Sequence, residues 1–196
     1  LAECVDIAAT DIENMVKFAK DNAIDLVMVA PDDPLVLGMV DAMEKEGIRA
    51  FGPRANAAII EGSKAFSKEL MKKYNIPTAN YEVFTDSTSA IDYIKAQNTF
   101  PTVIKADGLA LGKGVIIAQN LEEAEQAVHE MIDDGKFGKS GSRVVIEEFL
   151  TGPEVSVLAF TDGKTVKPMV SAQDHKRAYD NDEGLNTGGM GTFSPS

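Results

Sequence analysis

Apolar residues in the first third of the chain alternate between the spacing of helices and that of buried strands. In the helical stretches, residues 12–19 and 36–43, apolar side chains recur every three or four positions. Residues 26–29 form a continuous apolar run, which is typical of a parallel strand covered on both faces, and residues 48–51 form a second short strand. This β-α-β order predicts an open parallel sheet.

Polar residues indicate where the early helices begin. Thr10 and Glu13 have the spacing of a capping box, and Asp33 can cap the next helix. A short helix is expected at residues 56–60, and Ser63 can cap the next one, in which Phe66, Leu70 and Tyr74 recur at four-residue spacing.

The middle of the chain changes to an α+β pattern. Its order β-α-β-β-α-β matches the split β-α-β plan, a sheet covered by two helices. The predicted strands are residues 81–84, 102–105, 115–118 and 143–147, and the predicted helices are 87–96 and the segment that Asn120 and Glu123 cap.

A glycine-rich loop joins two of these strands. It carries three glycines and two lysines: Gly108, Gly112, Gly114, Lys105 and Lys113. Glycines allow backbone N–H groups to turn toward an anion, and lysines add positive charge, so the loop is a candidate phosphate cradle. The glycine spacing is not that of a Walker loop, and a strand rather than a helix follows, so we expect a movable flap. An ordinary glycine-rich hairpin is the alternative.

The last segment combines a hairpin with two polar motifs. Alternation at residues 154–160, a turn at Asp162 and Gly163 and a return strand at 167–171 predict the hairpin. Residues 173–177 mix a carboxylate, a histidine and two cations, and residues 186–191 bring three glycines. A solvated charged loop and a ligand site are both compatible with this pattern.

Composition narrows the function classes. The chain has 196 residues, 44% of them hydrophobic, and a net charge of -12, which argues against general nucleic-acid binding. No apolar run approaches the length of a membrane span, and no signal-peptide pattern begins the chain. The single cysteine, Cys4, excludes an internal disulfide, and with two histidines it leaves too few ligands for a His/Cys zinc site.

Seven runs together resemble the ATP-grasp superfamily and, within it, the phosphoribosylamine–glycine ligase family, also called glycinamide ribonucleotide synthetases. The runs are residues 51–53, 61–66, 104–110, 112–115, 145–150, 173–177 and 186–191. The resemblance implies an α/β and α+β fold, a partial ATP-grasp preceded by the remnant of a Rossmann-like domain. The implied boundaries are 1–62 for that remnant, 63–78 for an entry helix, 79–150 for a lid subdomain and 151–196 for the start of the central subdomain.

The resemblance also implies a reaction. ATP would phosphorylate glycine, and 5-phosphoribosylamine would attack the glycyl phosphate to give glycinamide ribonucleotide, ADP and phosphate in purine biosynthesis. The expected cofactors are ATP and Mg²⁺ or Mn²⁺, with the protein ligands of the metal outside this chain. The expected setting is the cytoplasm, with small-molecule substrates, no nucleic-acid or membrane partner, and a monomer.

The resemblance assigns three groups of residues. The catalytic group is Lys176, Arg177 and Asn186. The ATP-binding group is Lys64, Lys105, Gly108, Gly112, Lys113, Gly114, the adenine hinge Glu147, Glu148, Phe149 and Leu150, and the ribose contact Glu154. The substrate-binding group is Pro31, Asp32, Asp174, His175, Gly188, Gly189 and Met190.

For several of these residues, a purely structural role is the alternative to ligand binding. Lys64 alone fits a solvated surface lysine, and residues 31–34 fit a simple strand-to-helix turn. His175 fits a general base or a packed, hydrogen-bonded histidine, of which we favour the second.

The chain begins at Leu1, and no run corresponds to the first strand and phosphate loop of the family. We therefore expect a piece truncated at both ends that is not a competent ligase by itself. A nucleotide-binding fragment without catalysis, or another ATP-grasp carboxylate–amine ligase, is the alternative.

Overall fold

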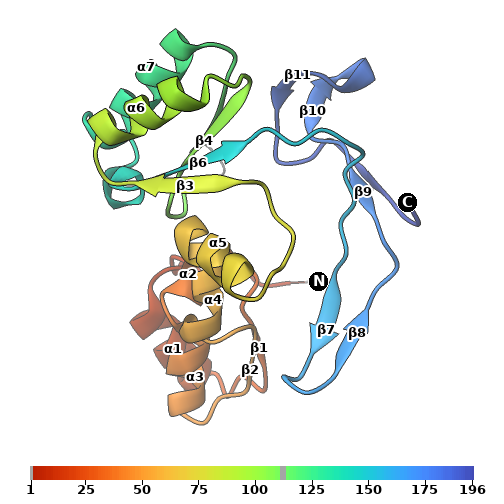
Figure 1. Cartoon of the computed structure of the whole chain (residues 1–196). Helices are drawn as coiled ribbons and strands as arrows, with labels where there is room; N and C mark the ends of the chain where they lie inside the picture. Colours follow the sequence, from red (N-terminus) through yellow and green to blue (C-terminus); the bar gives the residue numbers. More distant parts are fainter. Residues whose placement is uncertain (1, 111–113) are drawn as a thin grey trace. The chain divides into compact units, whose positions relative to one another are not determined.

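The computed structural model describes residues 2–110 and 114–196, with only the backbone of Lys139 and Asn186 (Figure 1). The predicted ATP contacts Gly112 and Lys113 lie outside the described residues. The chain divides into two compact units, Leu1–Phe149 and Leu150–Ser196, and each is described by itself.

The first unit begins with a small parallel sheet and its helices. Helices α1 (Ile12–Asp21), α2 (Asp32–Val36) and α3 (Met39–Lys45) accompany strands β1 (Val27–Met28) and β2 (Ala50–Phe51). The two strands pair in parallel, as the β-α-β pattern predicts. A core of five side chains holds this part together: Ala19, Val29, Met39, Val40 and Met43.

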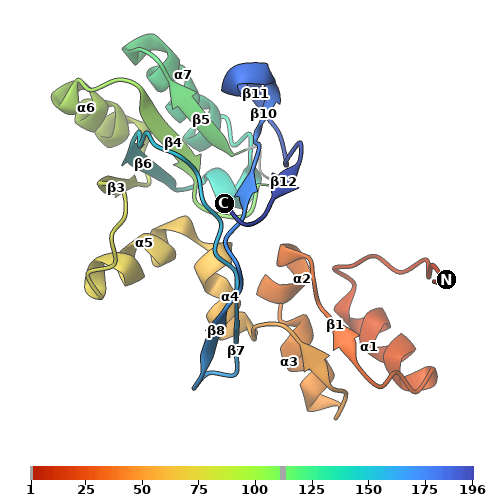
Figure 2. The same ribbon diagram turned by 90° about the vertical axis from the view of Figure 1, so that its right-hand side faces the viewer.

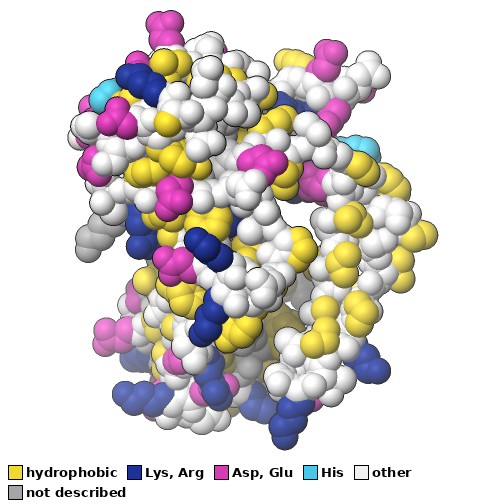
Figure 3. Space-filling model, in the orientation of Figure 1, with side chains coloured by type: hydrophobic (Ala, Val, Ile, Leu, Met, Phe, Trp, Pro, Cys, Tyr) yellow, Lys and Arg dark blue, Asp and Glu magenta, His cyan; other side chains and the backbone are white. Residues whose placement is uncertain are grey.

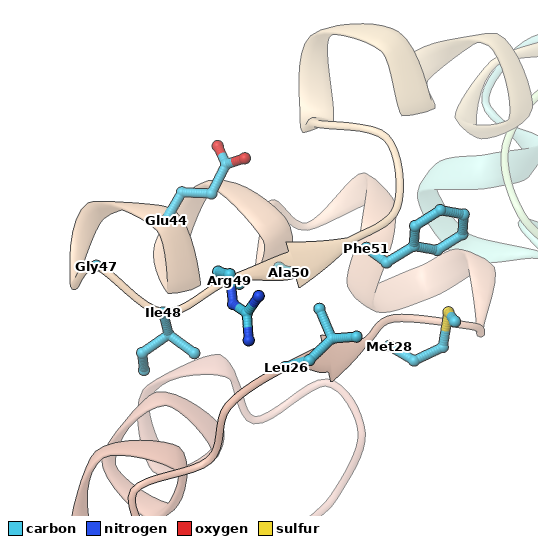
Figure 4. A pocket seen from close by; sticks show the side chains of 8 residues that line it. All are labelled: Leu26, Met28, Glu44, Gly47, Ile48, Arg49, Ala50 and Phe51. Atoms are coloured by element: carbon cyan, nitrogen blue, oxygen red, sulfur yellow. The ribbon is translucent and has the colours of Figure 1, made fainter. Parts of the chain in front are cut away.

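The prediction that the first strand is covered on both faces is wrong. Val27 and Ala50 pack against the helices, whereas Leu26 and Met28 are 53% and 62% exposed. Because neighbouring side chains in a strand point to opposite faces, one face meets the helices and the other is open. That open face borders a pocket of about 530 Å³, around which Leu26, Met28 and Phe51 lie (Figure 4).

Two predicted helix starts are also wrong. Asp11, not Thr10, caps α1, because its side chain accepts the N–H of Asn14 at 3.2 Å and the Asn14 amide at 2.7 Å. Asp33 lies inside the first turn of α2, with Pro31 at the N-cap position and no side-chain capping bond.

The predicted helix at 36–43 is two helices. Gly38 has a φ of +89°, a left-handed conformation that a continuous α-helix does not contain, so α2 ends before this residue and α3 begins after it.

Helices α4 (Ala55–Gly62) and α5 (Lys64–Lys73) follow. Ser63 caps α5 as predicted, since its hydroxyl accepts the N–H of Phe66 at 3.1 Å. Phe66 and Tyr74 are exposed, and the buried side chains of α5 are Ala65 and Lys68.

A four-stranded sheet completes the first unit. Its elements are β3 (Tyr81–Phe84), α6 (Ser87–Gln97), β4 (Thr102–Ala106), β5 (Val115–Ala118), α7 (Leu121–Ile132), the short helix η1 (Gly138–Gly141) and β6 (Val144–Glu148). The strand order is β3-β6-β4-β5, and all neighbours are antiparallel. Helices α6 and α7 cover one face (Figure 2), which confirms the β-α-β-β-α-β prediction.

Alternation along the central strands separates a core face from a polar face. Ile104, Ala106 and Ile146 join the core under the helices. Lys105 and Glu147 occupy the intervening positions and therefore point to the opposite face, where α5 contacts the sheet through Lys68.

The second unit consists of short strands. Strands β7 (Ala159–Thr161) and β8 (Val166–Pro168) form the predicted hairpin, β9 (Gln173–Asp174) pairs with β12 (Thr192–Phe193), and β10 (Arg177–Tyr179) pairs with β11 (Glu183–Asn186) around the short helix η2 (Asp180–Asp182). None of the side chains that the structure describes in this unit is fully buried. Hydrophobic side chains gather openly over the β7–β8 hairpin (Figure 3).

Candidate functional site

A buried carboxylate, Asp107, organises the polar face where β4 ends. Its Oδ1 accepts the Ser63 hydroxyl at 3.0 Å and the main-chain N–H of Ala65 at 2.7 Å. Its Oδ2 accepts two guanidinium N–H groups of Arg143, at 3.0 and 2.5 Å. Asp107 thus fastens the start of α5 to the sheet. Asp107 directly precedes Gly108 in the sequence, but no sequence pattern indicated its role.

Lys64 lies at the base of the flap rather than free in solvent. Its Nζ donates to the carbonyl of Gly108 at 3.0 Å, and its main-chain N–H donates to the carbonyl of Asp107 at 3.0 Å. Burial lowers the pKa of Lys64, the nearby Asp107 carboxylate opposes that shift, and the positive charge of Lys105 adds to it. The structure therefore brings the two predicted phosphate-binding lysines into one electrostatic neighbourhood.

Lys105 contacts a carboxylate that it shares with a second lysine. The Oε2 of Glu147 accepts Lys105 Nζ at 2.9 Å and lies 3.2 Å from Lys68 Nζ. Glu147 is 6% exposed, whereas the Lys105 side chain is 26% exposed, so Lys105 is the member of this trio that reaches solvent. Lys68 was missed because its position in the helical spacing gave no signal of burial.

The glycines at the two ends of the flap are required by packing. A Cβ on Gly108 would lie 2.5 Å from Ser140 Oγ, and one on Gly114 would lie 2.6 Å from the Cβ of Ala110. The N–H of Gly108 donates to the carbonyl of Ser140 at 3.3 Å, so this donor is already used within the protein. The glycine carbonyl at position 114 accepts the N–H of Ala106 at 2.8 Å and closes the hairpin.

The predicted adenine hinge, residues 147–150, begins within strand β6. Glu148 is held by Asn80, whose main-chain and side-chain N–H groups donate to Oε2 at 3.1 and 2.9 Å. Glu147 and Glu148 help to line a pocket of about 230 Å³ between the ends of β3, β4 and β6 and helix α6. Phe149 ends the first unit and Leu150, which is exposed, begins the second.

The second unit contains its own polar cluster. The carboxylate of Asp174 pairs with Lys176 and accepts the Thr192 hydroxyl at 3.2 Å. The hydrogen bond to Asp174 raises the pKa of Lys176, and the charge of Glu154 acts in the same direction. The same bond lowers the pKa of Asp174.

Backbone and guanidinium contacts connect the two polar motifs of this unit. Arg177 donates to the carbonyl of Gly184 at 2.7 Å, and the backbone of Arg177 is in register with that of Asn186. Thr187 donates its N–H and its hydroxyl to the carbonyl of Lys176, at 2.7 and 3.0 Å. Lys176 and Arg177 border an open pocket of about 840 Å³, which Glu154, Asp174 and Met190 also line.

His175 is exposed, and its contacts are one ring contact and two main-chain hydrogen bonds. Its ring stacks on Phe193 with centroids 5.8 Å apart. Its main chain exchanges hydrogen bonds with the glycine motif, since its N–H donates to Gly191 at 2.9 Å and its carbonyl accepts the N–H of Met190 at 2.7 Å.

The remaining candidates are Pro31, Asp32, Gly188 and Gly189. Pro31 and Asp32 begin α2 at the carboxyl end of β1. Gly188 has open space around its Cα, and Gly189 lies against Asp174. Among the residues that the structure describes, no group of three or more His, Cys, Asp or Glu side chains is placed to hold a metal ion, and no helix is long and apolar enough to cross a membrane.

The antiparallel sheet with two helices on one face and paired lysines on the other is the architecture of an ATP-grasp protein. The solved biotin carboxylase of Campylobacter jejuni shares this fold, at 16% identity and a TM-score of 0.74 over 86% of this chain and 39% of that one. Residues 62–196 match the family model of the phosphoribosylglycinamide synthetase ATP-grasp (A) domain, and residues 1–61 match that of its N domain. The chain belongs to the phosphoribosylglycinamide synthetase family, as the sequence motifs indicated.

Individual relatives agree with this assignment. The phosphoribosylamine–glycine ligase of Haemophilus influenzae is 55% identical over 194 residues, which are 99% of this chain and 45% of that protein. The ligase of the same name from Halalkalibacterium halodurans is 55% identical over 195 residues, again 45% of its length. The crystal structure of the ligase from Thermotoga maritima superposes with a TM-score of 0.67 at 41% identity, over 76% of this chain and 38% of that one. The chain thus spans about half the length of the curated relatives it matches.

Proposed function

We propose that this protein takes part in the ATP-dependent ligation of glycine to 5-phosphoribosylamine, which gives glycinamide ribonucleotide, ADP and phosphate in purine biosynthesis. The observation that carries the proposal is the family match over both parts of the chain, together with relatives of that activity that are 55% identical over nearly all of it. In this reaction a glycine carboxylate oxygen attacks the γ-phosphorus of ATP and ADP leaves. The substrate amine then attacks the acyl carbon, phosphate leaves, and the amine loses a proton.

In the first unit we assign ATP binding to the polar face. Lys64 and Lys105 would contact the phosphates, because phosphoryl transfer depends mainly on positioning and on neutralising charge. Their mutual proximity and the partial exposure of Lys105 support this role. The flap between Gly108 and Gly114 would close over the phosphates, and the backbone from Glu147 to Leu150 would bind adenine.

In the second unit we assign Lys176, Arg177 and Asn186 to the reacting phosphoryl and acyl groups. Lys176 keeps its charge beside Asp174, and negative charge grows on the acyl phosphate, so a fixed cation stabilises the transition state. Glu154 would accept hydrogen bonds from the ribose hydroxyls, since an ionised carboxylate is an acceptor only.

For the substrates we assign the polar motifs and the start of α2. Asp174, His175, Gly188, Gly189 and Met190 would border the acyl group, and Pro31 and Asp32 would contact substrate at the edge of the parallel sheet.

The metal and the setting belong to the same proposal. Mg²⁺ or Mn²⁺, when bound with ATP, lowers the charge repulsion of the β- and γ-phosphates. The proposal assigns it no ligand among the described residues. We further propose a cytoplasmic, monomeric protein that acts on small molecules, with neither nucleic acid nor a membrane as partner, and light scattering in solution tests the monomer.

Two measurements on the purified chain test the function. Calorimetry with MgATP should detect binding, and Lys105→Ala should weaken it while Lys95→Ala, which changes an exposed lysine of α6, should not. ADP release is then followed with glycine and phosphoribosylamine, each omitted in turn, with the Haemophilus influenzae ligase as positive control. ADP release that continues with unrelated amines would overturn the substrate assignment, and undetectable ATP binding would overturn the ATP site.

The alternative function is ATP binding without catalysis. A chain that binds ATP without turnover would be a nucleotide-binding module. ATP binding without ADP release, under conditions in which the positive control turns over, would select this function.

A further inference from the structure

Lys68 is a buried lysine on α5 that points at the sheet rather than at solvent. It is 7% exposed, and its ammonium contacts four groups. Thr78 Oγ1 lies at 2.7 Å, the carbonyl of Ala79 at 3.4 Å, Glu147 Oε2 at 3.2 Å and the ring centroid of Tyr81 at 5.5 Å. With its donors used in this way and little exposure, Lys68 has no free donor to offer a ligand.

The carboxylate between the two lysines has an unequal pair of partners. Glu147 Oε2 is close to both ammonium groups, but Lys68 is buried while Lys105 reaches the surface. Two cations face one anion, so the trio carries a net positive charge of one unit. If Lys105 were the sole partner of Glu147, the charge of that pair would be zero.

We infer that Lys68 is a positioning residue, which neutralises the Glu147 carboxylate so that the charge of Lys105 remains available to an anionic phosphate. Glu147 in turn fixes the direction in which Lys105 leaves strand β4. Lys68 is therefore not a catalytic residue, because it acts only through Glu147. This inference rests on the proposed function in that ATP supplies the phosphate.

The burial of Lys68 supports a role for its charge beside Glu147 and Lys105. A buried ammonium is costly unless it is paired and hydrogen-bonded, and Lys68 is both. A leucine or methionine at position 68 would fill the same space between α5 and the sheet without that cost. What the lysine adds is a positive charge on the buried side of Glu147.

The test is a double-mutant cycle, read by calorimetry with MgATP. Lys68→Met should weaken ATP binding by about fivefold to tenfold, the range typical of directly coupled charges. Adding Glu147→Gln to Lys68→Met should restore most of the affinity, because the carboxylate that Lys68 neutralises is then gone. Lys72→Met removes the same charge from an exposed position of the same helix and should have no such effect.

A purely structural role for Lys68 predicts a different result. In that case Lys68→Met loses affinity together with thermal stability, and Glu147→Gln makes the loss larger. Equal affinity of Lys68→Met and the unmodified chain would overturn the inference while leaving ATP binding, and so the proposed function, intact.

A second measurement does not need ATP. Modification of Lys105 by an amine-reactive ester, quantified on the peptide that contains it, should slow by about threefold in Lys68→Met as the Glu147 carboxylate holds that ammonium alone, and recover when Glu147→Gln is added. Should the unmodified chain bind no ATP, the proposed function fails and this rate still decides the inference. An unchanged rate in Lys68→Met would contradict it.

Discussion

The hydroxyl of Ser63 donates to the carboxylate of Asp107 at 3.0 Å, although 44 residues separate the two in the chain. The same carboxylate accepts an N–H of the first turn of α5, where the helix dipole favours negative charge. Helix N-termini often bind phosphate in this way, but here a side chain of the protein takes that place. Among the described residues of the first unit, Lys64 and Lys105 are therefore the cations that we propose for an external phosphate.

Replacing Asp107 tests how strongly it fastens α5 to the sheet. Asp107→Asn keeps the shape but loses the charge that pairs with Arg143, so we expect the free energy of unfolding to fall by about 2–4 kcal/mol. Ser63→Ala, which removes one cap, should cost about 1 kcal/mol. Urea unfolding followed by circular dichroism measures both. A smaller loss for Asp107→Asn than for Ser63→Ala would contradict the organising role of Asp107.

Gly108 is expected to be intolerant of any side chain. In Gly108→Ala the new Cβ would meet Ser140, so overpacking should cost about 1–3 kcal/mol. Ser140→Gly removes the colliding group, and the double variant should recover most of the loss of free energy of unfolding. Suppose that Gly108→Ala lowers the free energy of unfolding by the same amount in the Ser140→Gly background as in the unmodified chain. Close packing against Ser140 is then not the reason why glycine is needed.

The lowered pKa of Lys64 makes ATP binding depend on pH. Because the folded-state pKa lies below 10.5, the ammonium of Lys64 is lost earlier than in the unfolded chain as pH rises. ATP affinity should therefore fall through that lowered pKa, measured by calorimetry at several alkaline pH values. Arginine stays protonated over this range, so Lys64→Arg should keep its affinity where the unmodified chain loses it.

The same lowered pKa has a stability consequence of opposite sign. Between the folded-state pKa and 10.5 the unfolded chain binds more protons at this site, so the contribution of Lys64 to stability rises with pH. A midpoint of urea unfolding that shows no difference in pH dependence between Lys64→Met and the unmodified chain would contradict this sign.

Two glycines of one motif should respond differently to alanine. Gly189 has a φ of +127°, and its Cβ would lie 2.8 Å from Asp174 Oδ1, so Gly189→Ala should disturb the pair of Asp174 and Lys176. Gly191 has open space and is the matched control. Hydrogen exchange at the N–H of Met190, which donates to His175, should speed up in Gly189→Ala only. Equal exchange in both variants would show that the left-handed backbone is not needed there.

Spacing along the chain was sufficient for the four-stranded sheet. Tyr81–Phe84 and Val115–Ala118 begin and end where the sequence predicted strands. The prediction that the first strand is covered on both faces was wrong, because a short apolar run has the same sequence whether one face or both are covered. The exposure of Leu26 and Met28 could not be read from their residue types.

Polar contacts across the fold could not be predicted from spacing. Lys68 has polar neighbours in the sequence of α5, and contacts with Thr78 and Glu147, which are distant in the chain, bury it. Lys64 and Lys105 were named from the family motifs, and the structure adds that each is already tied to a partner, Gly108 and Glu147. Their roles toward ATP stay predictions.

The open apolar surface of the second unit has a consequence for affinity. Val157, Val170 and Leu185 are each more than 60% exposed. Ordering the side chains of Asp174, Lys176 and Arg177 costs conformational entropy. Little burial of apolar surface in this unit offsets that cost. An anion that binds Lys176 must therefore also supply the free energy that orders its surroundings. By thermodynamic linkage, any surface that covers these valines and the leucine would tighten anion binding without touching the anion.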